Sequence, residues 1–225
     1  MKNKVVLVSG GTQGIGLSIA NTFALDGYRV AVCARHNALL PNNITYFPCD
    51  VADKADIQRL ADSIIEHYGV IDVLVNNAGL FIPGSIQDED DSVLENLMRT
   101  NLYSAYYLTK RLLPTMIKNG GGTVINVCST ASTAAYSNGG AYAISKHALL
   151  GFSKCLRQET KAQNIRVLSV LPGATYTGSW DGSGVPEERM MPAQDVAKII
   201  FESYKLSDRT VVEEILIRPL LGDIS

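Results

Sequence analysis

The sequence contains few residues of the kinds that build metal sites, and these residues are scattered. It has three histidines and four cysteines, with no H-E-x-x-H motif and no C-x-x-C pair. Metal centres with nitrogen and sulfur ligands need such residues in clusters. We therefore expect no bound metal, and we interpret the cysteines as small hydrophobic residues of apolar runs. The residues concerned are His36, His67, His147, Cys33, Cys49, Cys128 and Cys155.

The sequence also lacks long apolar segments and an excess of charge of either sign. No apolar run approaches the roughly 20 residues of a membrane helix, and the apolar part of the start MKNKVVLVSGG is too short for a secretory signal. The 20 basic and 22 acidic residues give a formal net charge of -2. This balance gives no reason to expect a nucleic acid or an anionic membrane as a partner. We expect a cytoplasmic protein.

Internal repeats, low-complexity segments and interdomain linkers are absent as well. The 225 residues, 46% of them hydrophobic, suffice for one domain with a sizeable core, so we expect residues 1–225 to form a single domain. Two common catalytic signatures are also missing, because no glycine-rich turn ends in Gly-Lys-Ser/Thr and no G-x-S-x-G motif is present. These absences exclude a P-loop nucleotide site and the nucleophile elbow of a serine hydrolase.

What the sequence does contain is a regular alternation of β-branched apolar runs with amphipathic segments. Continuous Val/Ile/Leu runs are typical of strands buried on both faces of a parallel sheet, and helices must then cover both faces. We therefore predict an α/β fold with a doubly wound parallel sheet. The predicted strands are 5–10, 28–34, 44–50, 70–79, 121–129, 164–173 and 213–219, and the predicted helices are 14–27, 52–69, 92–118, 139–162 and 192–206.

Three segments carry further expectations. The helix 92–118 contains Pro114, and we expect an irregularity in it around Asn101. The helix 192–206 has a proline in its first turn, where proline is tolerated. Residues 173–191 are rich in glycine and serine and contain no predicted element. Such a segment in a compact domain is usually a lid or substrate loop; the alternative is a tolerated surface insertion.

A glycine-rich turn follows the first predicted strand directly. Glycines at positions 10, 14 and 16 allow a tight turn, close approach of the backbone to a pyrophosphate, and close packing of helix on strand. The N-terminus of the next helix then presents unpaired N–H groups and a favourable dipole to the phosphates. The turn predicts a dinucleotide site, and a glycine turn without a ligand is the alternative. We assign to this site Gly10, Thr12, Gln13, Gly14, Ile15 and Gly16.

The end of the second predicted strand bears on which dinucleotide binds. In NAD sites an acidic residue about 20 residues further on binds the ribose 2′-hydroxyl. Here the sequence reads VCARHN, so Ala34 is followed by Arg35, and a guanidinium suits a 2′-phosphate. We predict a preference for NADP(H), with NAD(H) possible. An exposed arginine at a strand end is the alternative.

Ser129, Tyr142 and Lys146 form the most informative constellation in the chain. Tyr142 and Lys146 stand four residues apart, a spacing that places both side chains on one face of a helix. Tyrosine ordinarily has a pKa of about 10, and a neighbouring ammonium favours the phenolate, so such a pair suits acid–base catalysis. A serine hydroxyl on a neighbouring strand end could hold a substrate oxygen. By itself the Tyr-x-x-x-Lys spacing is weak evidence.

The order of these motifs resembles the short-chain dehydrogenase/reductase family over essentially the whole chain. The resemblance implies an oxidoreductase with a Rossmann-like single domain around a sheet of about seven strands. None of the motifs is decisive alone, and together they are specific. They are the turn Gly10–Gly16, Asp50-Val51, Asn76-Asn77-Ala78-Gly79, Asn101, Ser129, Tyr142-x-x-x-Lys146, Pro172-Gly173 and Thr177.

The resemblance implies roles for residues that bind the cofactor. Asp50 and Val51 are expected at the adenine, and Asn76 beside the cofactor in the middle of the sheet. The backbone around Thr175, together with Thr177, is expected to bind the nicotinamide carboxamide. Simpler roles are available, because Asp50 could end a strand and Asn76 could cap a turn.

The resemblance also implies a mechanism. Ser129 and the Tyr142 hydroxyl bind the carbonyl oxygen of the substrate while hydride passes from the nicotinamide to the carbonyl carbon, and Tyr142 donates its proton as general acid. Lys146 binds the nicotinamide ribose and supports the tyrosine electrostatically. Asn101 is expected to hold a water through which Lys146 is reprotonated.

The C-terminal part of the chain is similar to bacterial sepiapterin reductases within this family. There Trp180 would lie over the pocket, where a flat pterin could stack on it; the alternative is a hydrophobic lid for any small ketone. We expect an NADPH-dependent carbonyl reductase first and a pterin side-chain reductase second. A 3-oxoacyl thioester reductase is a further alternative. A non-catalytic NADP-binding regulatory protein is another, although such proteins tend to lose the tyrosine or lysine that this chain keeps.

The expected partners are a small-molecule carbonyl substrate and further copies of the chain. In the family the two long helices, here 92–118 and 139–162, pair across two-fold axes into homodimers or homotetramers. Merely solvated helix faces are the alternative. Aromatic and apolar residues along both segments favour association: Tyr103, Tyr106, Tyr107, Leu149, Leu150 and Phe152.

Overall fold

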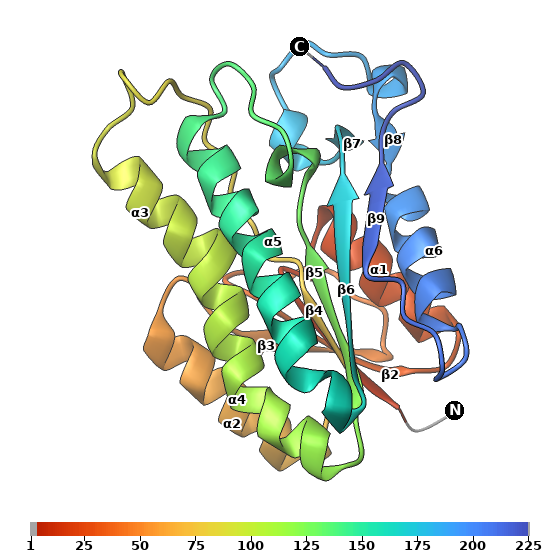
Figure 1. Cartoon of the computed structure of the whole chain (residues 1–225). Coiled ribbons are helices and arrows are strands. Elements are labelled where there is room, and N and C mark those ends of the chain that lie inside the picture. Colours follow the sequence, from red (N-terminus) through yellow and green to blue (C-terminus); the bar gives the residue numbers. More distant parts are fainter. Residues whose placement is uncertain (1–3, 225) are drawn as a thin grey trace.

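A parallel sheet lies at the centre of the computed structural model, which describes residues 4–224 (Figure 1). Its seven strands lie in the order β3-β2-β1-β4-β5-β6-β9, and every neighbouring pair is parallel, which confirms the predicted sheet. Residues 1–3 and 225 of the expected domain lie outside the described residues. The strands are β1 Val5–Ser9, β2 Arg29–Ala34, β3 Ile44–Pro48, β4 Val73–Asn76, β5 Gly122–Val127, β6 Ile165–Pro172 and β9 Glu214–Ile217.

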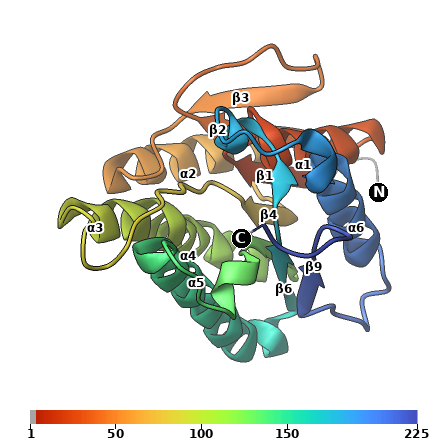
Figure 2. The same ribbon diagram turned by 90° about the horizontal axis from the view of Figure 1, so that it is seen from above.

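Helices cover both faces of the sheet (Figure 2). Residues along β1 alternate between two cores, with Val6 and Val8 in one and Val5 and Leu7 in the other. The first core includes α1 and α6 with Phe23 at its centre, and the second includes α2 and α4. The continuous apolar run of a strand buried on both faces follows from this arrangement. The helices are α1 Gly14–Leu25, α2 Lys54–Tyr68, α3 Ser92–Met98, α4 Ser104–Lys118, α5 Gly140–Thr160 and α6 Ala193–Tyr204.

The long segment 92–118 is a helix with a defect, as its sequence predicts. A π-helical turn, Arg99–Tyr103, joins α3 to α4 without a break in the chain of helical turns, and Pro114 lies within α4. Single π-helical turns inside helices are rare and occur frequently at functional sites. Asn101, in the middle of this turn, is 1% exposed.

The segment 173–191 is more ordered than its composition suggests. Its ends pair as a small parallel ladder of β7 (Thr175–Tyr176) and β8 (Met191–Pro192), and 3₁₀ turns form at Gly178–Trp180 and Glu187–Arg189. Strands of two residues carry no periodicity, so the sequence gives no signal for them. The proline that we expected in the first turn of α6 instead precedes that helix as its N-cap, in an extended conformation.

The strand order places a reversal at the middle of the sheet. From β1 the chain moves outward through β2 and β3, and it then returns to the other side of β1 with β4. In doubly wound sheets ligands bind at such a reversal, beyond the carboxyl ends of the strands. Figure 2 looks onto these ends, and the C-terminal segment lies over them. Within residues 4–224 no helix has the length and apolar character needed to cross a membrane.

Candidate active site

A cleft of about 1690 Å³ opens over the reversal point. It extends from the turn between β1 and α1 to the segment that follows β6 and to the C-terminal residues. This volume exceeds the roughly 300–1,000 Å³ of a typical small-molecule site, so the cleft has room for a dinucleotide and a second molecule. All of the site residues predicted from the sequence line the cleft except Gly16, Asn76 and Asn101.

The glycine turn is built as its motif requires. Gly10 and Gly14 have φ angles of 63° and 53°, in the left-handed region that favours glycine. The Gly10 amide donates a hydrogen bond to the Cys33 carbonyl at 2.8 Å, which ties the turn to the end of β2. Gly16 lies beneath the turn, where a Cβ atom would stand 2.2 Å from the Gly10 carbonyl oxygen. Gly16 therefore permits the close packing of α1 and does not itself face the cleft.

The first turn of α1 is open to an anionic ligand. Gln13 at the N-cap makes no hydrogen bond from its side chain to the helix, and the first turn contains no acidic residue. The amide groups of a helix start need acceptors, and its dipole favours negative charge there. Thr177 packs over this turn from the far wall, because a Cβ on Gly14 would lie 3.1 Å from its methyl carbon.

Basic side chains gather at the end of the cleft beside β2. Arg35 is exposed and makes no ion pair with any residue of 4–224. His36, next to Arg35 in the chain, and Lys54, at the start of α2, also line the cleft, and sequence reasoning missed both. The Lys54 ammonium lies 4.5 Å from the centroid of the Tyr107 ring. Asp50 lies nearby, where its carboxylate accepts a hydrogen bond from the Ala52 amide at 2.9 Å.

Of the two adjacent asparagines at the end of β4, Asn77, which follows the strand, lines the cleft and Asn76, its last residue, does not. The Asn77 amide nitrogen donates to the carbonyls of Ser9 and Gly10, each at 3.0 Å, and so holds the glycine turn. Asn76 points toward α4, where its amide donates to Thr109 at 3.0 Å and to Asn126 at 2.8 Å. Successive strand residues face opposite sides of a sheet, so only one of the pair can face the ligand side.

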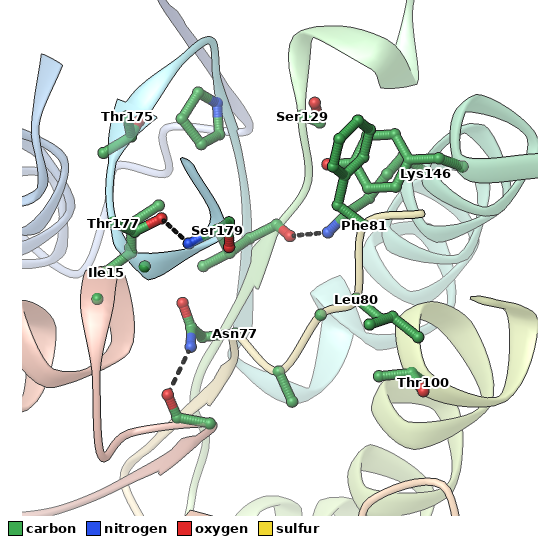
Figure 3. Close-up of a pocket in the computed structure, with 18 of the residues that line it drawn as sticks. Ile15, Asn77, Leu80, Phe81, Thr100, Ser129, Lys146, Thr175, Thr177 and Ser179 are labelled. Carbon is green, nitrogen blue, oxygen red and sulfur yellow. Dashed lines mark hydrogen bonds between the residues drawn. The ribbon is translucent and has the colours of Figure 1, made fainter. Parts of the chain in front are cut away.

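Figure 3 shows Ser129, Phe81 and Lys146 at one wall of the cleft, and the Tyr142 ring lies beside Lys146 and Phe81 in the same lining. Lys146 is 4% exposed and donates to the Val127 carbonyl at the end of β5, with a donor–acceptor distance of 3.0 Å. Its ammonium lies 5.9 Å from the centroid of the Tyr142 ring, and the Phe81 ring lies edge-on to that ring at 4.9 Å. Helix α5 and strand β5 thus bring an ammonium, a phenol and a hydroxyl to one place.

Asn101 stands behind this wall and uses its amide on protein partners. Its Oδ1 accepts from the Leu80 amide at 2.7 Å, and its Nδ2 donates to the Leu80 carbonyl at 3.0 Å and to Ser145 Oγ at 2.9 Å. A Cβ on Gly79 would lie 3.5 Å from the Lys146 ammonium and 3.6 Å from Asn101 Oδ1. Gly79 therefore lies in contact distance of both side chains.

The opposite wall comes from the segment after β6. Thr175 is buried and its hydroxyl donates to the Gly173 carbonyl at 3.0 Å. Thr177 caps the following turn through the Ser179 amide, and that turn ends at Trp180, which lines the cleft. Figure 3 shows Thr175 and Thr177 across the cleft from Ser129 and Lys146.

Two parts of the lining had no signal in the sequence. Arg218 and Asp223 follow β9, form an ion pair at 3.0 Å, and reach the cleft. Asp223 can do so because Gly173 has no side chain, since a Cβ there would stand 2.7 Å from its carboxylate. Tyr136 lines the cleft from the loop before α5, where partial desolvation of its half-exposed side chain and the nearby Tyr142 raise its pKa to about 12. It therefore offers a phenolic proton as a donor at neutral pH.

These features fit a nicotinamide dinucleotide. The glycine turn and the open start of α1 suit a pyrophosphate, and Arg35 and Asp50 lie where the adenosine end would bind. The ammonium, phenol and hydroxyl gather at the other end, where the redox chemistry would occur. In residues 4–224 no group of three or more His, Cys, Asp and Glu side chains is arranged to hold a metal.

The packing at Gly16 predicts the effect of adding one methyl group. Gly16→Ala should weaken NADPH binding by about tenfold or more, because the turn must move to relieve the clash with the Gly10 carbonyl. Gly151→Ala is the control, since a Cβ there meets no atom within 4 Å. Binding is measured by titration of NADPH fluorescence. A Gly16→Ala protein that binds NADPH as tightly as the Gly151→Ala protein would contradict this account.

Comparisons with known proteins agree with this geometry. A family model described as short chain dehydrogenase matches residues 4–185. The sepiapterin reductase of Chlorobaculum tepidum is 33% identical over 243 aligned positions, which cover 98% of each protein. A putative ketoacyl reductase of Streptomyces coelicolor is 34% identical over 187 positions, covering 78% of this chain and 72% of that protein.

A solved structure is similar over almost the full length. The closed form of a serine dehydrogenase complexed with NADP+ superposes with a TM-score of 0.90 at 26% identity, over 98% of this chain and 97% of that one. The family match over most of the chain and the relative that spans its whole length show that this protein belongs to the short-chain dehydrogenase/reductase family, and it is therefore an NAD(P)-dependent oxidoreductase that acts on CH–OH or C=O groups.

Proposed function

We propose that this enzyme reduces the carbonyl group of a small ketone to an alcohol with NADPH. The observation that carries the proposal is the meeting of Ser129, Tyr142 and Lys146 at one wall of the cleft. A hydroxyl and a phenol can both donate hydrogen bonds to one carbonyl oxygen, and the ammonium supplies positive charge where negative charge develops.

When bound, the nicotinamide cofactor supplies a hydride to the carbonyl carbon. Ser129 Oγ and the Tyr142 hydroxyl bind the carbonyl oxygen and polarise the C=O bond. Tyr142 gives its phenolic proton to that oxygen as it becomes an alkoxide, and the Lys146 charge stabilises the phenolate that remains. Lys146 has three N–H donors, one of them bonded to Val127, so others remain for the ribose hydroxyls. A water between Asn101 and Lys146 that reprotonates the lysine stays a prediction.

The tyrosine role predicts a selective loss. Tyr142→Phe should reduce turnover by about 10²–10⁴-fold, because the phenol that protonates the developing alkoxide is removed, while NADPH binding survives because the ring is kept. Tyr68→Phe is the control, because Tyr68 lies on α2 and does not line the cleft. Steady-state rates and NADPH titration are measured for both proteins. A Tyr142→Phe protein with more than about a tenth of normal turnover would rule out the assignment.

We also propose that NADPH is preferred over NADH. The support is the exposed guanidinium of Arg35 at the end of β2, where no carboxylate follows the strand, together with the adjacent His36, which also lines the cleft. A phosphate on the ribose 2′-oxygen would meet positive charge there, and NADH would gain nothing from it.

Removing the guanidinium tests this preference. Arg35→Ala should raise the Kd for NADPH by about 10- to 100-fold, the effect of losing charge-assisted hydrogen bonds, and should leave the Kd for NADH nearly unchanged. Arg209→Ala removes the same charge from an exposed position outside the cleft and controls for net charge. Fluorescence titrations of the wild-type protein and both variants with NADPH and with NADH give the six Kd values. Equal effects of Arg35→Ala on NADPH and NADH would contradict the proposal.

A pterin side-chain reductase is the second candidate. Trp180 offers a flat apolar face at the cleft, and the Asp223 carboxylate could accept N–H groups of a pterin ring. The full-length relative from Chlorobaculum tepidum is named a sepiapterin reductase. The putative ketoacyl reductase relative keeps a 3-oxoacyl thioester open as a third substrate class. A non-catalytic regulatory role is disfavoured by the retained tyrosine and lysine.

A substrate panel separates these candidates. NADPH consumption is followed with sepiapterin, small diketones and 3-oxoacyl thioesters, and the same panel is run with Trp180→Ala. We expect turnover of diketones by the wild-type protein. Turnover of sepiapterin alone, with a strong loss in Trp180→Ala, would favour the second candidate. If no substrate of the panel supports NADPH consumption, the proposal that this enzyme reduces carbonyl groups of these substrate classes is contradicted.

Two structural roles complete the proposal. The segment 173–191 is proposed to cover the substrate, since Trp180 and Ser183 face the cleft from it. Association into a homodimer or homotetramer through α4 and α5 is supported by exposed apolar side chains on these helices. Tyr103 just before α4, Tyr106 on α4 and Ile144 on α5 are each between 43% and 45% exposed.

A further inference from the structure

Ser145 lies between Tyr142 and Lys146 in the sequence of α5, but it faces away from the cleft. Its side chain is fully buried. Its hydroxyl donates to the Tyr142 carbonyl at 2.7 Å and accepts from Asn101 Nδ2 at 2.9 Å. The hydroxyl therefore joins the helix that carries the tyrosine to the π-helical turn that carries Asn101.

The direction of these hydrogen bonds is determined by the partners. The Leu80 amide can only donate, so Asn101 must turn its oxygen toward it, and the two Asn101 N–H groups then go to Leu80 and Ser145. Ser145 accepts from Asn101 and has one proton left, which goes to the Tyr142 carbonyl. No alternative arrangement satisfies all of these groups, so the network specifies one geometry.

Besides this network, the start of α5 is held by a bridge between Gly84 and Gly139 and by the Gly84 amide, which donates to the Asn138 carbonyl at 3.0 Å. Gly139, at the N-cap, has no side chain to cap the helix, and the preceding residues 133–138 are exposed. Tyr142 lies within the first turn of this helix. A helix end without caps frays, and any movement there moves the phenol relative to Ser129.

The same asparagine is also linked to the ring of Tyr142, through Leu80 and Phe81. Asn101 holds both backbone groups of Leu80, and the next residue, Phe81, places its ring edge-on to Tyr142 at 4.9 Å. One amide thus fixes the backbone of Tyr142 through Ser145 and the neighbour of its ring through Leu80. The π-helical turn at Arg99–Tyr103 is what presents Asn101 to both.

We propose that Ser145 is a positioning residue for the reaction, which holds Tyr142 in its productive place by linking it to Asn101. This inference rests on the proposed role of Tyr142 as proton donor. Ser145 touches neither substrate nor cofactor, and its effect passes through the position of the phenol. Small displacements of a reacting group reduce rates steeply, by about 100-fold for 1 Å.

The chain offers a matched control on the same helix. Ser153 is also buried on α5, donates to a carbonyl of its own helix (Leu149, 2.9 Å) and accepts from an asparagine amide of another element (Asn126, 2.7 Å). It lies eight residues further along α5, about 12 Å away, and does not line the cleft. Ser145→Ala and Ser153→Ala therefore remove the same kind of network bond, near the tyrosine and far from it.

The kinetic test compares these two variants in the full-length protein. We expect both to lower the Tm by several degrees. Ser145→Ala should also lower kcat by about 10- to 100-fold with little change in the KM for NADPH, while Ser153→Ala keeps kcat within about twofold. Ser145→Cys keeps the side-chain volume and a weak hydrogen-bond donor, so it should recover part of the lost kcat. It also replaces Ser145→Ala in the comparison if the alanine protein does not fold. Equal kcat values for Ser145→Ala and Ser153→Ala, or no recovery in Ser145→Cys, would overturn the proposal.

A second readout does not depend on turnover. Hydrogen exchange of the NADP-bound proteins reports opening of the first turns of α5, residues 140–146. Ser145→Ala should speed exchange there, and Ser153→Ala should not. If the wild-type protein reduces no carbonyl, the proposed function fails, while this comparison still decides whether Ser145 holds the tyrosine. Unchanged exchange at 140–146 in Ser145→Ala would contradict the positioning role.

Discussion

The ammonium of Lys146 is buried beside the carboxyl end of β5, and much of the site is arranged around it. A buried charge needs partners, and the protein supplies one, the Val127 carbonyl at 3.0 Å. Its remaining donors face the region where a polar ligand would bind. Gly79 lies beside the ammonium, where a Cβ atom would stand 3.5 Å from it. The ammonium can therefore donate a hydrogen bond to a bound ribose hydroxyl and stabilise a developing phenolate by its charge.

The fold brings the parts of this site together by simple means. Parallel strands end at one edge of the sheet, so the glycine turn, Asn77 and Ser129 meet there although they are far apart in sequence. Two long helical segments, joined at Asn101 and Ser145, then place the tyrosine and lysine over that edge. Hydrogen bonds of Ser145 tie the catalytic wall to Asn101, whereas the wall formed by residues 173–191 rests on a ladder of only two residue pairs.

The sequence was informative where short-range rules apply. Strand runs, helix faces, the glycine turn and the Tyr-x-x-x-Lys spacing depend on local geometry, and the sheet was predicted from them. The irregularity expected near Asn101 is confirmed as the π-helical turn. The sequence was uninformative where a contact depends on tertiary packing. No pattern distinguishes Asn76 from Asn77, because the side of the sheet that each faces is set by the end of β4. Asp223 reaches the cleft only because Gly173 leaves room, and the two-residue strands β7 and β8 have no periodicity.

The most direct test of the central claim follows the hydride itself. NADPH carrying deuterium in the transferable position at nicotinamide C4 is incubated with the enzyme and the best ketone of the panel, and the alcohol is analysed by mass spectrometry. Direct hydride transfer predicts one deuterium on the carbon that was the carbonyl carbon. When unlabelled NADPH is used in deuterated water, that carbon should carry no deuterium. An alcohol without deuterium from the cofactor would contradict carbonyl reduction by this site.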